Sequence, residues 1–90
     1  MKTIDELRAY LIDTFSDEQI FLFGSRARGS ASAYSDIDIA IKGRTSLGDK
    51  LSVAKFAIEE STLPQKVDLI DLSQAPWLNE TIRREGVRWH

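Results

Sequence analysis

The stretch that decides the fold runs from Phe23 to Ala40 and reads FGSRARGSASAYSDIDIA. It places Gly24 and Ser25 directly after an apolar run, and it ends with Asp36 and Asp38 alternating with isoleucines. Strict alternation is typical of a β-strand, so the isoleucines are predicted on one face and the two acids on the other. Two like charges on one strand face repel each other, and partly buried ones cost stability unless a cation neutralises them. The pattern therefore predicts both a strand and a site that needs a positive ion.

Composition limits the classes of protein to which the chain can belong. Its 90 residues are 42% apolar, and 12 basic against 14 acidic residues give a formal charge of -2. This size and composition predict a single domain, residues 1–90, and the charge balance predicts no direct binding of nucleic acid. There is no cysteine, and the longest apolar run, Ile20–Phe23, is far too short to span a membrane. We therefore expect a cytoplasmic protein with no membrane partner.

Periodicity and end signals predict the secondary structure. The Thr3–Glu6 capping box and apolar residues at helical spacing predict the first helix. The expected elements, in order, are a helix over 4–15, a strand over 19–23, a helical turn and loop over 25–34, a strand over 36–42, a helix over 47–60, a strand over 66–72 and a helix from about 73 to 86. Residues 87–90 fit either a short edge strand or a frayed tail.

This order of elements predicts an α/β fold with a small mixed three-stranded sheet flanked by helices. The short link between the first two strands favours an antiparallel pair, whereas the helical crossover to the third favours a parallel pair. In such a sheet, Gly24-Ser25, the two acids at 36 and 38, and Asp68 all fall at the same end. The topology therefore predicts that three separate segments meet there.

Carboxylates that meet in this way are candidate metal ligands. Asp36, Asp38 and Asp68 offer only oxygen, which favours magnesium or manganese over zinc. Three such carboxylates suit a two-metal cluster that activates a hydroxyl and stabilises a leaving pyrophosphate. Asp71 lies three residues after Asp68 and must face the other side of the strand, so we do not include it. The alternative is that the acids at 36 and 38 form the solvated face of an edge strand.

The segment Gly24-Ser25 is the candidate for binding an anion. A glycine at a strand end, followed by a helical turn, lets backbone N–H groups approach phosphate oxygens. An ordinary tight turn is the alternative. A Walker A loop is excluded because Ser30 stands where its lysine is needed, and an EF-hand is excluded because Ile39 and Ala40 replace the required polar ligand and glycine.

These residues resemble a known family. Gly24-Ser25, ten residues, and then Asp36-Ile37-Asp38 reproduce the G-S-x10-D-x-D signature of the DNA polymerase β-like nucleotidyltransferase superfamily, and GSRARGSASAYSDIDIAI is similar to its minimal nucleotidyltransferase branch. The similarity extends to the first helix, to Val67-Asp68-Leu69 as the strand of the third carboxylate, and to the last helix. From the sequence we expect no second domain that would hold a nucleic acid or a small-molecule acceptor.

The resemblance implies roles for individual residues. Gly24 and Ser25 would hold the triphosphate of ATP, and Arg26 would contact its phosphates or, as the alternative, have a role on the protein surface. Asp36 and Asp38 would bind two Mg²⁺ ions, and Asp68 would bind one of them and help to deprotonate the acceptor hydroxyl.

The resemblance also implies a biological role. Minimal nucleotidyltransferases of this size are commonly antitoxins of a HEPN-domain ribonuclease toxin, and some transfer AMP to a tyrosine of that toxin. We therefore expect a Mg²⁺-dependent nucleotidyltransferase that modifies a hydroxyl of a HEPN partner protein. The alternative is an antitoxin with little or no catalysis that neutralises its toxin by binding.

Overall fold

The computed structural model describes residues 1–90, and its elements follow the expected order closely. The α-helices are α1 (Ile4–Thr14), α2 (Ser25–Arg28), α3 (Asp49–Glu59) and α4 (Asn79–Glu85), the strands are β1 (Gln19–Phe23), β2 (Ile37–Lys42), β3 (Val67–Asp71) and β4 (Val87–Arg88), and two 3₁₀ turns, η1 (Leu72–Gln74) and η2 (Pro76–Leu78), precede α4. The Thr3 hydroxyl accepts a hydrogen bond from the Glu6 N–H at 3.2 Å, which confirms the predicted cap of α1.

The sheet has four strands in the order β3-β2-β1-β4, so the prediction of three strands was wrong by one. As predicted, β1 and β2 are antiparallel and β2 and β3 are parallel. The fourth strand forms because β1 pairs with β2 on one side only, which leaves backbone groups on its other side for the C-terminal residues. Leu22 pairs with Val87 there, and the pairing continues as the Trp89 N–H donates to the Ile20 carbonyl at 2.8 Å.

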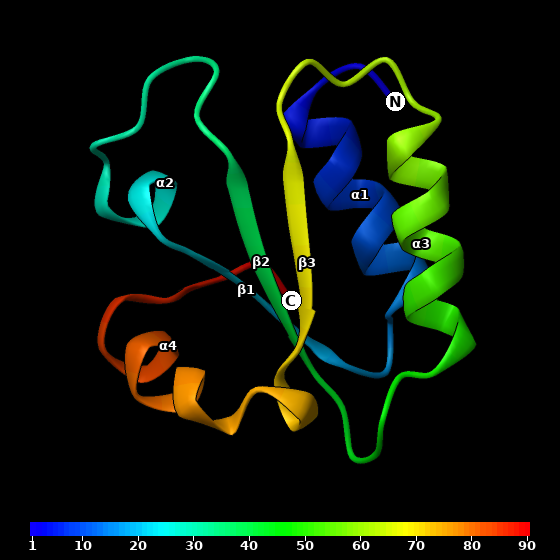
Figure 1. Cartoon of the computed structure of the whole chain (residues 1–90), viewed down its shortest axis with the longest axis vertical. Coiled ribbons are helices and arrows are strands. Elements are labelled where there is room, and N and C mark those ends of the chain that lie inside the picture. The colour runs from blue at the N-terminus through cyan, green and yellow to red at the C-terminus, as the bar shows by residue number, and fades with distance from the viewer.

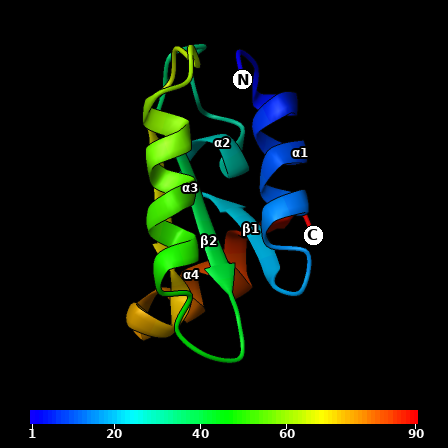
Figure 2. The same ribbon diagram turned by 90° about the vertical axis from the view of Figure 1, so that its right-hand side faces the viewer.

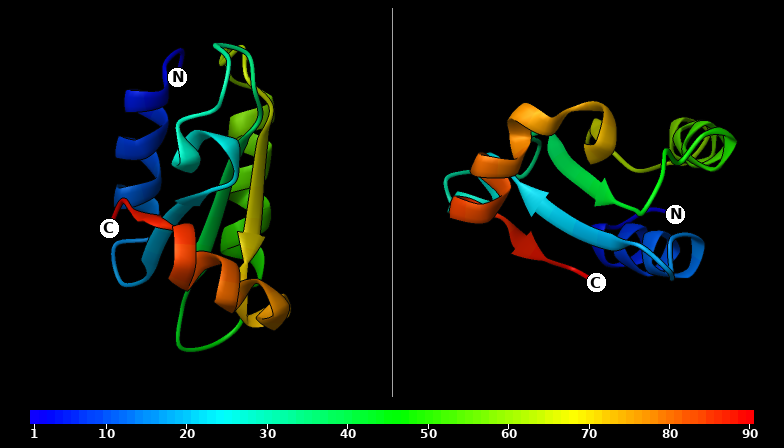
Figure 3. Two further views of the ribbon diagram at one scale, coloured as in Figure 1. Left: turned by 90° about the vertical axis from the view of Figure 1, so that its left-hand side faces the viewer. Right: turned by 90° about the horizontal axis from the view of Figure 1, so that it is seen from below.

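Helices cover both faces of this sheet (Figures 1 and 3). α1 and α3 lie on one side, and α2 and α4 lie on the other. Ile37, Ile39 and Ile41 are fully buried in the larger core, which lies under α1 and α3. Ala40, from the opposite face of β2, packs with Phe23 and Ile82 in the smaller core under α4. The predicted alternation of β2 is therefore confirmed.

Two predicted boundaries moved for local reasons. The helix expected from residue 47 begins only at Asp49, because Gly48 before it has φ of +57°, a conformation outside the helix. The helix expected from residue 73 begins only at Asn79, because Pro76 opens a separate 3₁₀ turn. α1 and α3 contact one another, and Figure 2 shows both of them in front of the strands. None of the helices combines the length and the apolar character needed to cross a membrane.

Candidate active site

The register of the sheet aligns the segments that the sequence predicted to meet. Asp38 on β2 lies opposite Phe23 at the end of β1 on one side, and opposite Asp68 on β3 on the other. Neighbouring strands lie about 4.8 Å apart, and aligned residues of parallel strands point to the same face. The carboxylates of Asp38 and Asp68 are thus side by side. Because β2 is the second strand in from the β3 edge, the alternative of a solvated edge strand does not hold for Asp38.

The electrostatics of Asp38 reflect this crowding. Its side chain is half-buried, whereas Asp36 and Asp68 are exposed. Burial raises the pKa of Asp38 above its ordinary value of 3.8, and the negative charges of Asp68 and Asp36 raise it further, while Arg28 opposes the rise. The negative charges of Asp36 and Asp68 therefore act on Asp38, and this repulsion favours a bound cation.

Gly24 stands at the meeting point of β1 and α2, where only a glycine fits. Its φ is +78°, and a Cβ atom added there would collide with the carboxylate of Asp38. The backbone conformation therefore favours glycine, and any larger residue would also have to displace the carboxylate of Asp38. The backbone at residue 24 consequently lies directly against the carboxylate of Asp38, so an anion held at this turn would also be next to the acids.

Ser25 begins α2, a single helical turn. Gly24 accepts from the Arg28 N–H at 3.1 Å, and Gly29, with φ of +76°, ends the turn. The first N–H groups of a helix have no partner within the helix. A glycine at the end of a strand followed by a helical turn is the local structure that the sequence predicted, and the binding of an anion by its N–H groups stays a prediction.

The two arginines of α2 behave differently. The Arg26 guanidinium, predicted at the phosphates, donates instead to backbone carbonyls of the loop over 29–36, including Ser35 at 3.0 Å. The Arg28 guanidinium donates to Glu85 of α4 at 3.1 Å. Each arginine thus already has a hydrogen-bond partner within the protein, and neither contact prevents a nucleotide from binding.

Asp71 points away from the acids, as expected, and has a structural role. It is 5% exposed, and its carboxylate accepts from the Leu47 N–H at 2.9 Å and from the N–H and hydroxyl of Ser73 at 3.0 and 2.7 Å. Burial would raise the pKa of Asp71, but these hydrogen bonds outweigh burial and lower it. This residue ties the start of the α3 segment to the end of β3.

Gln65 was missed by the sequence analysis. Its amide donates to the Ala33 carbonyl at 2.9 Å, which connects the residues before β3 to the loop before β2. A single glutamine in a polar stretch carries no pattern that could have indicated this contact. Only the spatial approach of two loops distant in sequence reveals it.

The donor set fits magnesium without forming a closed cage. No group of three or more acidic or histidine side chains is arranged to hold a metal ion by itself. Magnesium usually takes one or two carboxylates and completes its shell with water and substrate phosphates. Asp38 and Asp68 are aligned beside the candidate phosphate-binding turn, and Asp38 is half-buried and repelled by like charges. This arrangement fits the coordination that magnesium usually has.

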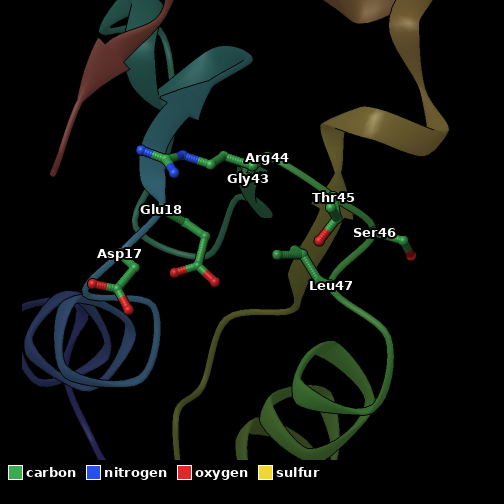
Figure 4. A pocket seen from close by; sticks show the side chains of 7 residues that line it. All are labelled: Asp17, Glu18, Gly43, Arg44, Thr45, Ser46 and Leu47. Carbon is green, nitrogen blue, oxygen red and sulfur yellow. The ribbon is translucent and has the colours of Figure 1, made fainter.

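Two cavities border the sheet. One, of about 510 Å³, lies between α3 and β3 and includes Asp68 in its lining. Another, of about 450 Å³, is drawn in Figure 4 and lies at the opposite end of the sheet, where Glu18 precedes β1 and Gly43 follows β2. The second cavity is remote from the acids, so we do not assign it to the site.

Known proteins resemble this chain in sequence and in structure. Residues 5–88 match the family described as Polymerase beta, Nucleotidyltransferase. A "Probable protein adenylyltransferase MntA" from Haemophilus influenzae is 44% identical over 59 residues, which cover 61% of this chain and 49% of that protein. The chain thus matches about half the length of this curated relative.

Solved structures show the same fold. A toxin–antitoxin complex with AMP-PNP has a TM-score of 0.77 and 27% identity, covering 98% of this chain and 73% of its own. A toxin–antitoxin MntA variant with two aspartates replaced by glutamate has a TM-score of 0.73 and 25% identity, covering 96% and 70%. With nearly the whole chain matched by the family, and with its signature residues meeting in space, this protein belongs to the polymerase beta nucleotidyltransferase family.

Proposed function

We propose that this chain is a Mg²⁺-dependent nucleotidyltransferase that transfers AMP from ATP to a hydroxyl of a HEPN-domain toxin and so acts as its antitoxin. The observation that supports this most is the alignment of Asp38 with Asp68 on one sheet face, next to the turn at Gly24. The relatives are consistent with it, since one is named a protein adenylyltransferase and another is a toxin–antitoxin complex with an ATP analogue.

In this proposal the residues divide the work between binding and chemistry. Gly24 and Ser25 hold the triphosphate through backbone N–H groups. Asp36, Asp38 and Asp68 are the ligands for two magnesium ions, which when bound neutralise charge on the triphosphate and on the leaving pyrophosphate. We propose that residues 1–90 act as one nucleotidyltransferase domain in the cytoplasm, where ATP is supplied.

The reaction balances without any further reagent. The acceptor hydroxyl oxygen forms a bond to the α-phosphorus of ATP, and the bond between this phosphorus and the oxygen that bridges to the β-phosphorus breaks. Pyrophosphate leaves with that bridging oxygen. In this proposal Asp68, which is exposed on β3, accepts the hydroxyl proton as the bond forms.

The test is the intact mass of the cognate HEPN protein after incubation with this chain, ATP and Mg²⁺. We expect a gain of one or more AMP masses, and we expect Asp36→Ala with Asp38→Ala to lower the rate by about 10³-fold or more, since metal ligands contribute several kcal/mol. Asp13→Ala, which removes an exposed aspartate of α1, is the matched control and should retain the rate.

One outcome would replace the enzyme by the alternative function. If the HEPN protein gains no nucleotide mass and is neutralised equally by the native chain and the double alanine variant, the chain acts by binding alone. Exposed apolar side chains on the outer face of α3, Val53 and Phe56, are then the first candidates for the contact.

A further inference from the structure

The loop over residues 29–36 connects α2 to β2 and delivers Asp36 and Asp38 to the site. It lies on the surface with an exposed tip, where Tyr34 is 77% exposed. Such loops are ordinarily mobile unless other groups hold their backbone. Here the loop backbone is held from two sides, by side chains that come from α2 and from the segment before β3.

Arg26 holds the loop from the α2 side. Its Nε and one Nη donate to the Ser35 carbonyl at 3.2 and 3.0 Å, and the same Nη also lies 3.0 Å from the Ala33 carbonyl and 3.3 Å from that of Ser32. Several carbonyls are thus turned toward one guanidinium, whose planar fork matches such an arrangement better than an ammonium does. Ser35 is the residue immediately before Asp36, so the bonds from Arg26 to the Ser35 carbonyl fix the backbone directly before the acid pair.

Gln65 holds the same loop from the β3 side. Its amide nitrogen donates to the Ala33 carbonyl at 2.9 Å, which is one of the carbonyls that Arg26 also binds. The next residue, Lys66, accepts from the Ile37 N–H at 2.8 Å, where β2 starts beside β3. Gln65 precedes Asp68 by three residues. The Ala33 carbonyl therefore links the loop that leads to Asp36 and Asp38 with the segment that leads to Asp68.

We propose that Arg26 and Gln65 form a clamp that sets the separation between the β2 acids and Asp68, and that Arg26 is a positioning residue and not a ligand of the phosphates. The proposal rests on the function proposed above. The clamp holds the backbone directly before the acid pair, so the repelling carboxylates are kept near Asp68 before any cation binds.

The two roles for Arg26 predict different results for Arg26→Lys. A lysine retains the positive charge that a phosphate needs, but it cannot reproduce a fork over several carbonyls. A phosphate ligand would mainly change the KM for ATP, whereas a clamp would mainly change kcat and the concentration of Mg²⁺ needed for half-saturation. Arg83→Lys is the control, because Arg83 is an exposed arginine of α4 that contacts Glu80 and neither the loop nor the acids.

Gln65→Met gives a second, independent variant. It removes the donor to Ala33, and it also removes the Gln65 Oε1, which is buried without a hydrogen-bond partner. Loss of an unsatisfied buried oxygen offsets the lost hydrogen bond, so we expect the melting temperature to stay unchanged. A functional change in this variant would then not arise from unfolding.

The experiment measures three quantities on each full-length variant. These are amide hydrogen exchange over residues 29–37, the Mg²⁺ concentration that gives half of the thermal stabilisation with AMP-PNP, and kcat and KM for ATP with the HEPN acceptor. For Arg26→Lys and Gln65→Met we expect at least threefold faster exchange in the loop, a severalfold higher Mg²⁺ requirement and about a tenfold lower kcat, with KM changed less than threefold. Arg83→Lys should resemble the native chain in all three.

Two results would overturn the clamp. One is a KM for ATP that rises tenfold in Arg26→Lys with unchanged kcat and loop exchange, which would make Arg26 a phosphate ligand. The other is a Gln65→Met variant that matches the native chain in loop exchange and in Mg²⁺ requirement. Exchange and Mg²⁺ titration need no turnover, so they still test the clamp if the native chain transfers no AMP.

Discussion

Asp38 and Asp71 are two strand carboxylates of the same sheet whose pKa values shift in opposite directions. Asp71 is almost fully buried and receives hydrogen bonds from the Leu47 N–H and from Ser73, and these lower its pKa. Asp38 is less buried, yet burial and the charges of Asp68 and Asp36 raise its pKa. The more buried acid is thus the more stable anion.

The difference lies in what surrounds each carboxylate. A structural carboxylate is satisfied by N–H and O–H donors, and it stabilises the fold as an ion. A carboxylate that binds a ligand instead lies beside like charges and has no cation as a partner until the ligand binds. This arrangement lowers the stability of the unliganded protein. The sheet carries both kinds, with Asp38 and Asp71 at opposite ends and on opposite faces.

The largest expected effect on stability comes from removing Asp71. Asp71→Ala leaves the Leu47 N–H without its partner in a buried place and removes the two bonds from Ser73. We expect a loss of about 3 kcal/mol in the free energy of unfolding, measured by urea denaturation at pH 7. Asp68→Ala, from the exposed site on the same strand, should lose less than about 0.5 kcal/mol.

The pH dependence sharpens this prediction. Because the pKa of Asp71 is lowered in the folded state, its contribution is complete above its ordinary value of 3.8 and disappears as pH falls through the lowered folded value. The native chain should therefore lose stability relative to Asp71→Ala only below about pH 4. An equal difference between the two proteins at pH 7 and pH 2 would contradict the assignment of an ionised Asp71.

The contrast also explains what the sequence could predict. Strand alternation and the lengths of the connections placed Asp38 and Asp68 at one end and Asp71 on the other face, because both follow from the twofold repeat of a strand and the direction of a crossover. The fourth strand was left open, because two residues carry too weak a pattern to distinguish a strand from a tail. The partners of Asp71 and Gln65 could not be predicted, since they depend on how loops distant in sequence approach one another.

The next largest expected effect comes from removing the charge of Asp38, which should raise the free energy of unfolding instead of lowering it. Because the pKa of Asp38 is raised in the folded state, the folded protein binds the proton more tightly, and stability falls as pH rises from 3.8 through the raised value. At pH 7 the penalty is complete, so Asp38→Asn without metal should raise the free energy of unfolding, by less than about 1 kcal/mol for a half-exposed like-charge contact. Thermal unfolding in EDTA measures it.

Magnesium should reverse the order of melting temperatures between the native chain and Asp38→Asn. Binding to the folded state alone stabilises it in proportion to the logarithm of ligand concentration, so the native chain should gain melting temperature with Mg²⁺ and AMP-PNP while Asp38→Asn gains little. If Asp38→Asn melts well below the native chain in EDTA, Asp38 contributes to the fold in the way that Asp71 does, and the distinction between the two acids is lost.

The smallest expected effect tests the one cation that opposes the repulsion at Asp38. Arg28 lowers the pKa of Asp38, and its guanidinium is held by Glu85 at 3.1 Å, with the two side chains 52% and 21% exposed. Pairs this exposed contribute little, so a double-mutant cycle of Arg28→Ala and Glu85→Ala should give a coupling of about 0.5 kcal/mol, and less in 1 M salt. Arg83 and Glu80, an exposed pair within α4, provide the matched cycle and should couple more weakly, since neither partner is half-buried. Equal couplings would mean that the link from α2 to α4 adds nothing beyond a surface ion pair, and that Arg28 acts on Asp38 through its charge alone.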